Sequence, residues 1–124
     1  MIAVIFEAEP ADGRFQDYLD LATGLRPLLD STDGFISVER FQSLSNPAKL
    51  VSLSFFENED AVRRWRETAE HRSAQSAGRH GVFVDYRLRV AAVVRDYSLH
   101  DRHQVPAKYE QPQTVSDATH SANG

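Results

Sequence analysis

One stretch of the sequence, RRWRETAEHRSAQSAGRHG at residues 63–81, carries side chains that can bind a small molecule and move its protons. It contains the chain's single tryptophan, Trp65, and a histidine, His71, six residues later. An indole ring can stack on an aromatic ligand, and an imidazole can exchange a proton near neutral pH. These residue types suggest one wall of an aromatic-lined site with a proton donor or acceptor at its rim.

Helical spacing within this stretch places Trp65 and Arg72 on the face that turns toward the core. The neighbouring stripe is polar and includes Thr68, His71 and Gln75. A buried guanidinium needs a partner, so an inward Arg72 is a candidate for stabilising an anionic, enolate-like oxygen of a ligand.

The same residues also have structural interpretations, which the sequence leaves open. Trp65 suits a core anchor as well as a ligand-binding wall, and His71 suits a surface histidine that is hydrogen-bonded to a neighbour. Arg72 suits a salt bridge to Glu39 or Asp85.

Hydrophobic periodicity predicts the elements that must position this stretch, in the order β-α-β-β-α-β. Two segments have helical spacing and four are apolar or alternate between apolar and polar residues. The expected helices cover about 12–29 and 59–77, and the expected strands cover 2–8, 35–44, 49–58 and 82–97.

Residues that begin and end helices refine this assignment. Asp12 and Asn58 are expected to cap the two helices, because their side-chain oxygens can accept hydrogen bonds from the first free N–H groups. Gly24 and Pro27 are expected to kink or divide the first helix. Gly78 is placed to end the second helix in the left-handed conformation.

This order of elements predicts an α+β, ferredoxin-like fold, in which both helices cover one face of an antiparallel sheet. The other face would expose apolar side chains, so we expect a homodimer with sheet facing sheet. The folded domain is expected over 1–97 and a polar tail over 98–124. That tail is either disordered or an arm that wraps over a partner through Val105, Pro106 and Tyr109.

Composition excludes several classes of function. A net charge of −4 without a basic block disfavours nucleic-acid binding, and the absence of cysteine excludes disulfides and thiolate chemistry. No apolar run has the length of a membrane span or a signal peptide, so we expect a cytoplasmic protein with no membrane partner. The segment HDRH at 100–103 lacks a framework for a metal site, and no P-loop, GxGxxG, GxSxG or HExxH motif is present.

Beyond these patterns, the chain resembles a known family. The element order, the run WRETAEHRSAQ from Trp65 and the strand DYRLRVAAVVRDY from Asp85 are similar to the antibiotic biosynthesis monooxygenases, a family of dimeric α/β barrels, over roughly residues 1–97. The resemblance implies that Trp65 is the family's helix tryptophan. His71 stands where the quinone-forming members carry a polar hydrogen-bonding residue, and Arg87 where they carry an arginine on the last strand.

Some family positions differ in this chain. The quinone-forming members have an asparagine one turn before the tryptophan, where this chain has Ala61. The haem-degrading members need an asparagine on the first strand, where Phe6 and Glu7 stand. They also need a histidine nine or ten residues after the tryptophan, where Ala74 and Gln75 stand.

The resemblance therefore implies an oxidoreductase: a cofactor-independent monooxygenase acting on a small phenol-, hydroquinone- or anthrone-like aromatic molecule. Trp65 would stack on the ring, His71 would manage the proton, and Arg72 or Arg87 would stabilise the phenolate. Thr68 and Gln75 would help to bind the substrate, and no metal or other cofactor is expected. The alternatives are a non-catalytic dimeric binding module and a haem-binding or haem-degrading protein.

Overall fold

The computed structural model describes residues 1–75 and 81–106, with the side chains of the second helix described as far as residue 69. The chain divides into a unit Met1–Ala92 and a unit that begins at Val93, and each is described by itself. The elements are β1 (Ile2–Pro10), α1 (Phe15–Asp30), β2 (Phe35–Gln42), β3 (Leu50–Phe56), α2 (Glu59–Gln75) and β4 (Phe83–Ala92).

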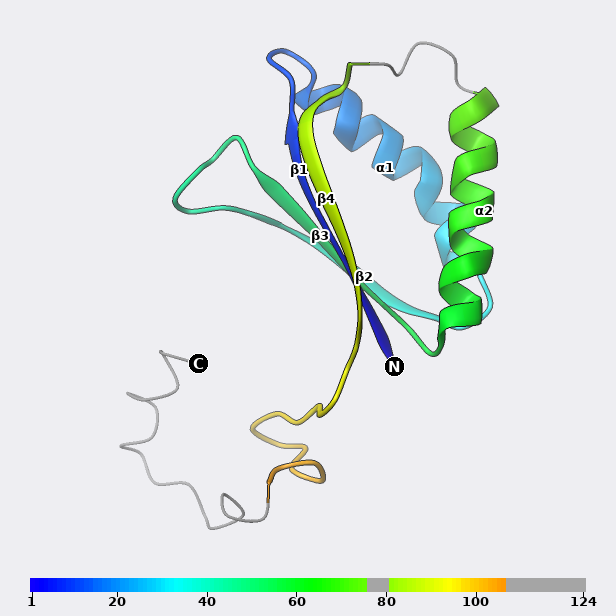
Figure 1. Ribbon diagram of the computed structural model, residues 1–124, viewed down its shortest axis with the longest axis vertical. Coiled ribbons are helices and arrows are strands. Elements are labelled where there is room, and N and C mark those ends of the chain that lie inside the picture. The colour runs from blue at the N-terminus through cyan, green and yellow to red at the C-terminus, as the bar shows by residue number, and fades with distance from the viewer. Residues whose placement is uncertain (76–80, 107–124) are drawn as a thin grey trace. The chain divides into compact units, whose positions relative to one another are not determined.

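The four strands form one antiparallel sheet in the order β2-β3-β1-β4, and both helices lie on the same side of it (Figure 1). The first and last strands are therefore neighbours, although they come from opposite ends of the domain. This arrangement confirms the predicted ferredoxin-like α+β fold.

The alternation of side chains along β1 defines the two sides of the sheet. Ile2 and Val4 pack against buried residues that include Leu29 of α1 and Ala61 of α2, so this side faces the helices. Glu7, an odd number of positions away, lies on the other side. Residues paired across antiparallel strands point to the same side, so the register extends this assignment to the whole sheet. We call the two sides the helix-facing side and the open face.

Helix α2 begins as its sequence predicts. The Oδ1 atom of Asn58 accepts a hydrogen bond from the backbone N–H of Ala61 at 2.9 Å. Glu59 and Asp60 occupy the first turn, where negative charge is favourable. The predicted C-terminal residue, Gly78, lies outside the described residues.

The predicted cap of α1 is wrong. The helix begins at Phe15, and the residue before it, Arg14, has no side-chain capping hydrogen bond. Gly13 has a φ of 76°, so the backbone turns between Asp12 and the helix and takes Asp12 out of the capping position.

The first helix is also not divided at Gly24 or Pro27, because one helix spans Phe15–Asp30. Pro27 removes its own hydrogen bond to the carbonyl of Thr23, but its carbonyl still accepts the N–H of Ser31 at 3.2 Å. Pro27 therefore removes one backbone hydrogen bond, and the helix continues to Asp30.

The last strand is shorter than the sequence predicts. It ends at Ala92, which pairs with Ile2, the first residue of β1, and beyond this pair β1 offers no further partner. The register of β1 and β4 shifts between Glu9 and Pro10, near the start of β4. Beyond the strand, the backbone N–H of Ser98 donates to the carbonyl of Asp101 at 2.7 Å and closes a turn.

Candidate functional site

Trp65 lies half-buried at the edge of one of two separate apolar clusters. We call this group the Trp65 cluster. Its members come from both helices and from three strands, so α2 is fixed on the sheet by this contact. The buried members are Leu29, Phe56, Ala61 and Val62, and the partly buried members are Ile2, Val4, Phe35, Val38 and Trp65.

A second cluster, the Tyr18 cluster, covers the other end of the helix-facing side. Tyr18, Leu50 and Val82 are buried in it, and Phe6, Leu19 and Phe83 pack around them. Its rings make edge contacts, with the Phe83 centroid 5.6 Å from both Phe6 and Tyr18. Such pairs add to the stability that apolar burial provides.

A strip of the sheet crosses the boundary between the two clusters, and small polar residues mark its centre. The register aligns one row across four strands and a parallel row beside it. Ser52 and Ser54 of β3 occupy the middle of the two rows, where larger apolar residues would join the clusters into one core. We call this strip the central rows: Arg40, Ser52, Phe6 and Leu88 in the first, and Val38, Ser54, Val4 and Val90 in the second.

The β4 end of the central rows is apolar and uncovered. Tyr86, Leu88 and Val90 lie on the helix-facing side by register, yet their exposed fractions are 63%, 52% and 46%. In a ferredoxin-like fold this side is normally covered by the helices. An apolar surface that extends from Phe6 to β4 is therefore left accessible beside α2.

Thr68 and Trp65 are the two predicted substrate-binding residues of α2 whose side chains are described. Thr68 is half-buried, and its hydroxyl donates to the carbonyl of Arg64 at 3.0 Å, one turn earlier. That hydroxyl oxygen can still accept a hydrogen bond from a ligand. The guanidinium of Arg64 donates a hydrogen bond to the backbone carbonyl of Asp33 at 2.9 Å.

The other three predicted residues of this helix are placed by their backbone alone. His71, Arg72 and Gln75 belong to α2, and their side chains lie outside the described part. The two carboxylates considered as partners for Arg72, Glu39 and Asp85, are on the open face of the sheet and so turn away from α2.

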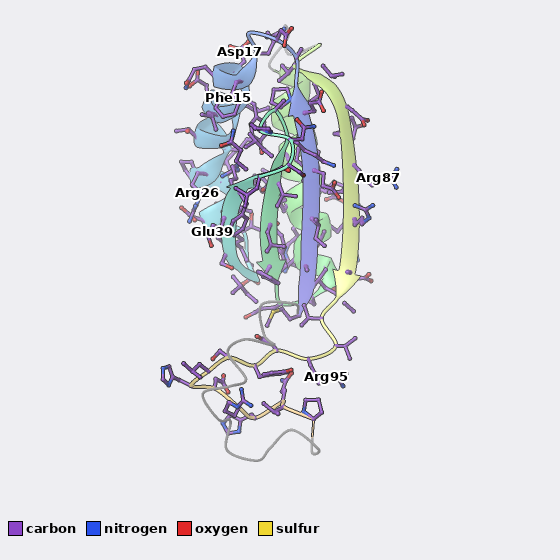
Figure 2. The ribbon with its side chains drawn as sticks, turned by 90° about the vertical axis from the view of Figure 1, so that its left-hand side faces the viewer. Phe15, Asp17, Arg26, Glu39, Arg87 and Arg95 are labelled. Carbon is purple, nitrogen blue, oxygen red and sulfur yellow. The ribbon has the colours of Figure 1, made fainter. Side chains whose placement is uncertain are left out.

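Arg87 is not brought together with Trp65. It pairs with Glu7 in the register and so lies on the open face, whereas Trp65 packs on the helix-facing side. Figure 2 labels Arg87 on β4 and Glu39 on β2, the two edge strands. Within one subunit, the sheet therefore separates Arg87 from Trp65.

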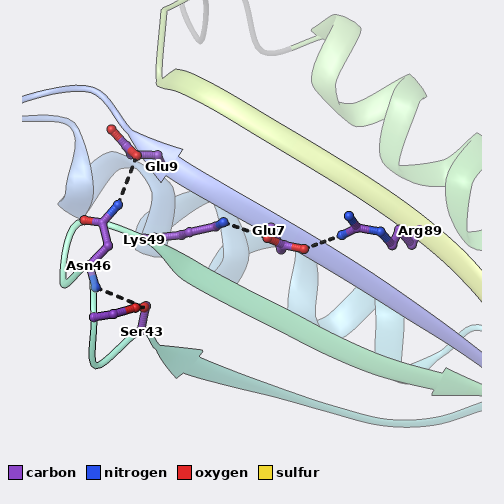
Figure 3. Close-up of polar contacts among 7 residues, drawn as sticks. Glu7, Glu9, Ser43, Asn46, Lys49 and Arg89 are labelled. Carbon is purple, nitrogen blue, oxygen red and sulfur yellow. Dashed lines mark hydrogen bonds and ion pairs between the residues drawn. The ribbon is translucent and has the colours of Figure 1, made fainter.

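The open face instead carries an ionic network centred on Glu7 (Figure 3). Its carboxylate pairs with the ammonium of Lys49 at 2.7 Å and with the guanidinium of Arg89. The pKa of Glu7 lies below its usual value of 4.5, because the carboxylate accepts hydrogen bonds from Lys49, which has the largest effect, and from Arg89. The network ties β4 and the β2–β3 hairpin to the central strand β1.

Replacement of Glu7 by glutamine is expected to change the acid dependence of stability. Because the pKa of Glu7 is lower in the folded state, its stabilising effect is complete above pH 4.5 and is lost as pH falls through the folded-state pKa. Glu7→Gln should therefore be less stable than wild type at pH 7, and the two should converge in acid. Urea unfolding from pH 7 to pH 3 measures this, with the exposed Glu67→Gln as the control. Parallel curves for Glu7→Gln and wild type would contradict the assignment.

Arg40, which lies in the first central row, is not among the residues predicted from the sequence for the site. The Nε atom of Arg40 donates to the hydroxyl of the buried Tyr18 at 3.4 Å. The sequence pattern that could have identified Arg40 is the alternation of FISVERFQ, which puts Arg40 on the same side of the strand as Val38 and on the opposite side from Glu39. It was overlooked because the sequence does not say which side of that strand faces the helices.

The described residues contain no group of three or more histidine, aspartate or glutamate side chains placed to hold a metal ion. Neither helix, as far as it is described, combines the length and the apolar character needed to cross a membrane.

Comparison with known proteins identifies relatives of this chain. It is 50% identical over 93 residues to the protein named Jasmonate monooxygenase ABM of Pyricularia oryzae, a match that covers 75% of this chain and 43% of the relative. The chain thus spans less than half the length of that relative.

Solved structures share the fold at low identity. A structure described as a putative antibiotic biosynthesis monooxygenase from Deinococcus radiodurans superposes with a TM-score of 0.67 at 13% identity, covering 80% of this chain and 98% of that one. A structure of MhuD with two manganese protoporphyrin IX molecules per active site gives 0.65 at 13% identity, covering 79% and 99%. The family model for antibiotic biosynthesis monooxygenases matches residues 1–77, and the chain belongs to this family.

Proposed function

We propose that this chain is a monooxygenase domain that binds a small organic substrate on the helix-facing side of its sheet. The observation that carries the proposal is the apolar surface of Tyr86, Leu88 and Val90, which faces the helices by register although each side chain is 46–63% exposed. The 50% identity to a relative named as a monooxygenase supports the class of reaction.

The substrate we propose is electron-rich and of the phenol, hydroquinone or anthrone type. Oxidation of an anthrone by O₂ to a quinone and water balances without an added reductant, because the substrate supplies all four electrons. The protein then has three tasks, which are to bind the substrate, to remove a proton and to exclude water. No cofactor is required for this reaction.

The proposed roles follow the position of α2. Trp65 would contact the substrate ring from the helix, and Thr68 and Gln75 would offer hydrogen bonds beside it. His71 would take the proton, and Arg72 would stabilise the phenolate.

Haem is less well supported as a ligand. Phe6 and Glu7 stand in the part of the first strand where the haem-degrading members carry an asparagine. Phe6 is engaged with the rings of Phe83 and Tyr86, and Glu7 forms ion pairs on the open face. These two side chains do not fit that role.

We further propose that a second copy of the chain covers the open face. Apolar residues of that face, including the half-exposed Phe41, alternate with its charged network. Such a mixed surface suits an interface between two copies better than it suits water. Light scattering is expected to give the mass of a dimer.

Oxygen uptake tests the proposed reaction. We expect the purified chain to consume O₂ and form a quinone with at least one member of a panel of anthrones and hydroquinones. Jasmonate, which the relative's name specifies, is tested for binding alone, because it cannot form a quinone and its hydroxylation would need two electrons from an added reductant. A haem titration in the same buffer should give no saturable Soret band.

Two results would contradict the proposal. Absence of uptake above the uncatalysed rate with every compound would favour a non-catalytic binding module. A Soret band that saturates at one haem per subunit would favour the haem-binding alternative.

A further inference from the structure

Charge is segregated between the two sides of the sheet. All four strands lie within the described residues, and the register places every acidic strand residue on the open face, namely Glu7, Glu9, Glu39 and Asp85. On the helix-facing side, Arg40 is the one strand residue in the register that carries a full charge. A cation in this position has no carboxylate of the sheet beside it.

Within the described residues, Arg40 also has no ion-pair partner on the helices. Other arginines of the domain pair with carboxylates, for example Arg26 with Asp30 and Arg89 with Glu7. Arg40 instead donates its Nε–H to the hydroxyl of Tyr18, which is 4% exposed and fixed in its cluster. This contact orients the guanidinium and leaves its two terminal nitrogens available as donors.

The first central row leads from this cation to the exposed apolar surface. Arg40 pairs with Ser52, Ser52 with Phe6, and Phe6 with Leu88. Adjacent strands are about 4.8 Å apart, so the row spans about 14 Å between the Cα atoms of its ends. It offers a cation at one end, a small hydroxyl next to it, and apolar side chains over the rest.

We propose that Arg40, oriented by Tyr18, binds the carboxylate of a small amphipathic substrate whose apolar body lies over Phe6 toward Leu88. The inference rests on the proposed function, because it defines the substrate class of that same site. One guanidinium balances the single charge of a carboxylate and matches its two oxygens. A phosphate monoester, with nearly two charges at pH 7, would need further cations that this row does not provide.

Matched acid and ester pairs test the proposal. Isothermal titration calorimetry would compare jasmonic acid with methyl jasmonate, and 1,4-dihydroxy-2-naphthoic acid with its methyl ester. Wild type is expected to bind each acid about tenfold more tightly than its ester, as for a partly exposed charge-assisted hydrogen bond. Arg40→Gln should lose that preference without weakening ester binding, and Arg40→Lys should keep part of it. Arg66→Gln, which removes the same charge from an exposed position on α2, should behave as wild type.

The outcomes separate this proposal from the proposed function. The carboxylate site would be overturned if wild type bound acid and ester equally well, or if Arg40→Gln kept the preference for the acid. Binding of the esters in either case would still support the apolar part of the site. Failure of wild type to bind any of the four compounds would overturn both.

Discussion

Replacement of Gly34 by alanine is expected to destabilise the domain by about 2–5 kcal/mol. Gly34 follows α1 and has a φ of 89°, a conformation that costs a residue with a side chain roughly 1–2 kcal/mol. A Cβ atom built on Gly34 would lie 2.6 Å from the Cβ of the fully buried Ala61. Relief of that overlap requires α2 to move away from the loop, at a further cost of about 1–3 kcal/mol.

The contacts around Gly34 explain why the loop cannot simply yield. The carbonyl of Gly34 accepts the backbone N–H of Glu57 at 2.8 Å, which fixes the loop to the end of β3. The preceding residue, Asp33, accepts a hydrogen bond from the guanidinium of Arg64 on α2. The loop is thus held from two sides, and the depth at which α2 docks is set by the absence of a side chain at Gly34.

Thermal and urea unfolding measure this effect, and the chain provides a matched control. Gly24 lies within α1, and a Cβ atom added there would meet nothing within 4 Å. Gly24→Ala should therefore stabilise the domain by about 0.5–1 kcal/mol, because glycine is a poor helix former. Gly34→Ala should lower the melting temperature by about 10 °C or more. A Gly34→Ala domain as stable as wild type would show that α2 does not dock against this loop.

The local patterns of the sequence predict most of the fold. Alternation identified the strands because one side of each strand is buried, and Asn58 capped α2 as expected because capping depends on neighbouring atoms alone. The cap of α1 was misassigned because Gly13 redirects the backbone after Asp12. The end of β4 was also misplaced, since the length of a strand depends on its neighbour, and β1 begins at Ile2.

The candidate site depends on pairing that a single sequence does not reveal. Arg40 and Phe6 share a row only because β3 lies between their strands in a particular register. A shift of one residue would move Arg40 to the open face. The same reasoning explains Arg87, which the family resemblance suggested for the site, although alternation places it on the mixed side of β4 with Asp85.

Replacement of His71 by alanine is expected to lower kcat for oxygen-dependent turnover by about 10²–10⁴-fold, the usual contribution of a positioned general base. Helical spacing continues the stripe of Arg64 and Thr68 to His71, one turn beyond Thr68 and on the side of α2 next to Trp65. A base at this position would lie close to a ring that contacts Trp65.

Measurements of oxygen uptake and quinone formation across pH would test this role. Wild-type activity should fall in acid as the imidazole becomes protonated, whereas the residual activity of His71→Ala should lack that dependence. His100→Ala removes an exposed imidazole from the segment after β4 and should leave both the rate and the pH profile unchanged. If His71→Ala turned over every accepted substrate at the wild-type rate, another group would have to take the proton. The affinity of His71→Ala for the substrate would then test separately whether the substrate binds on the helix-facing side.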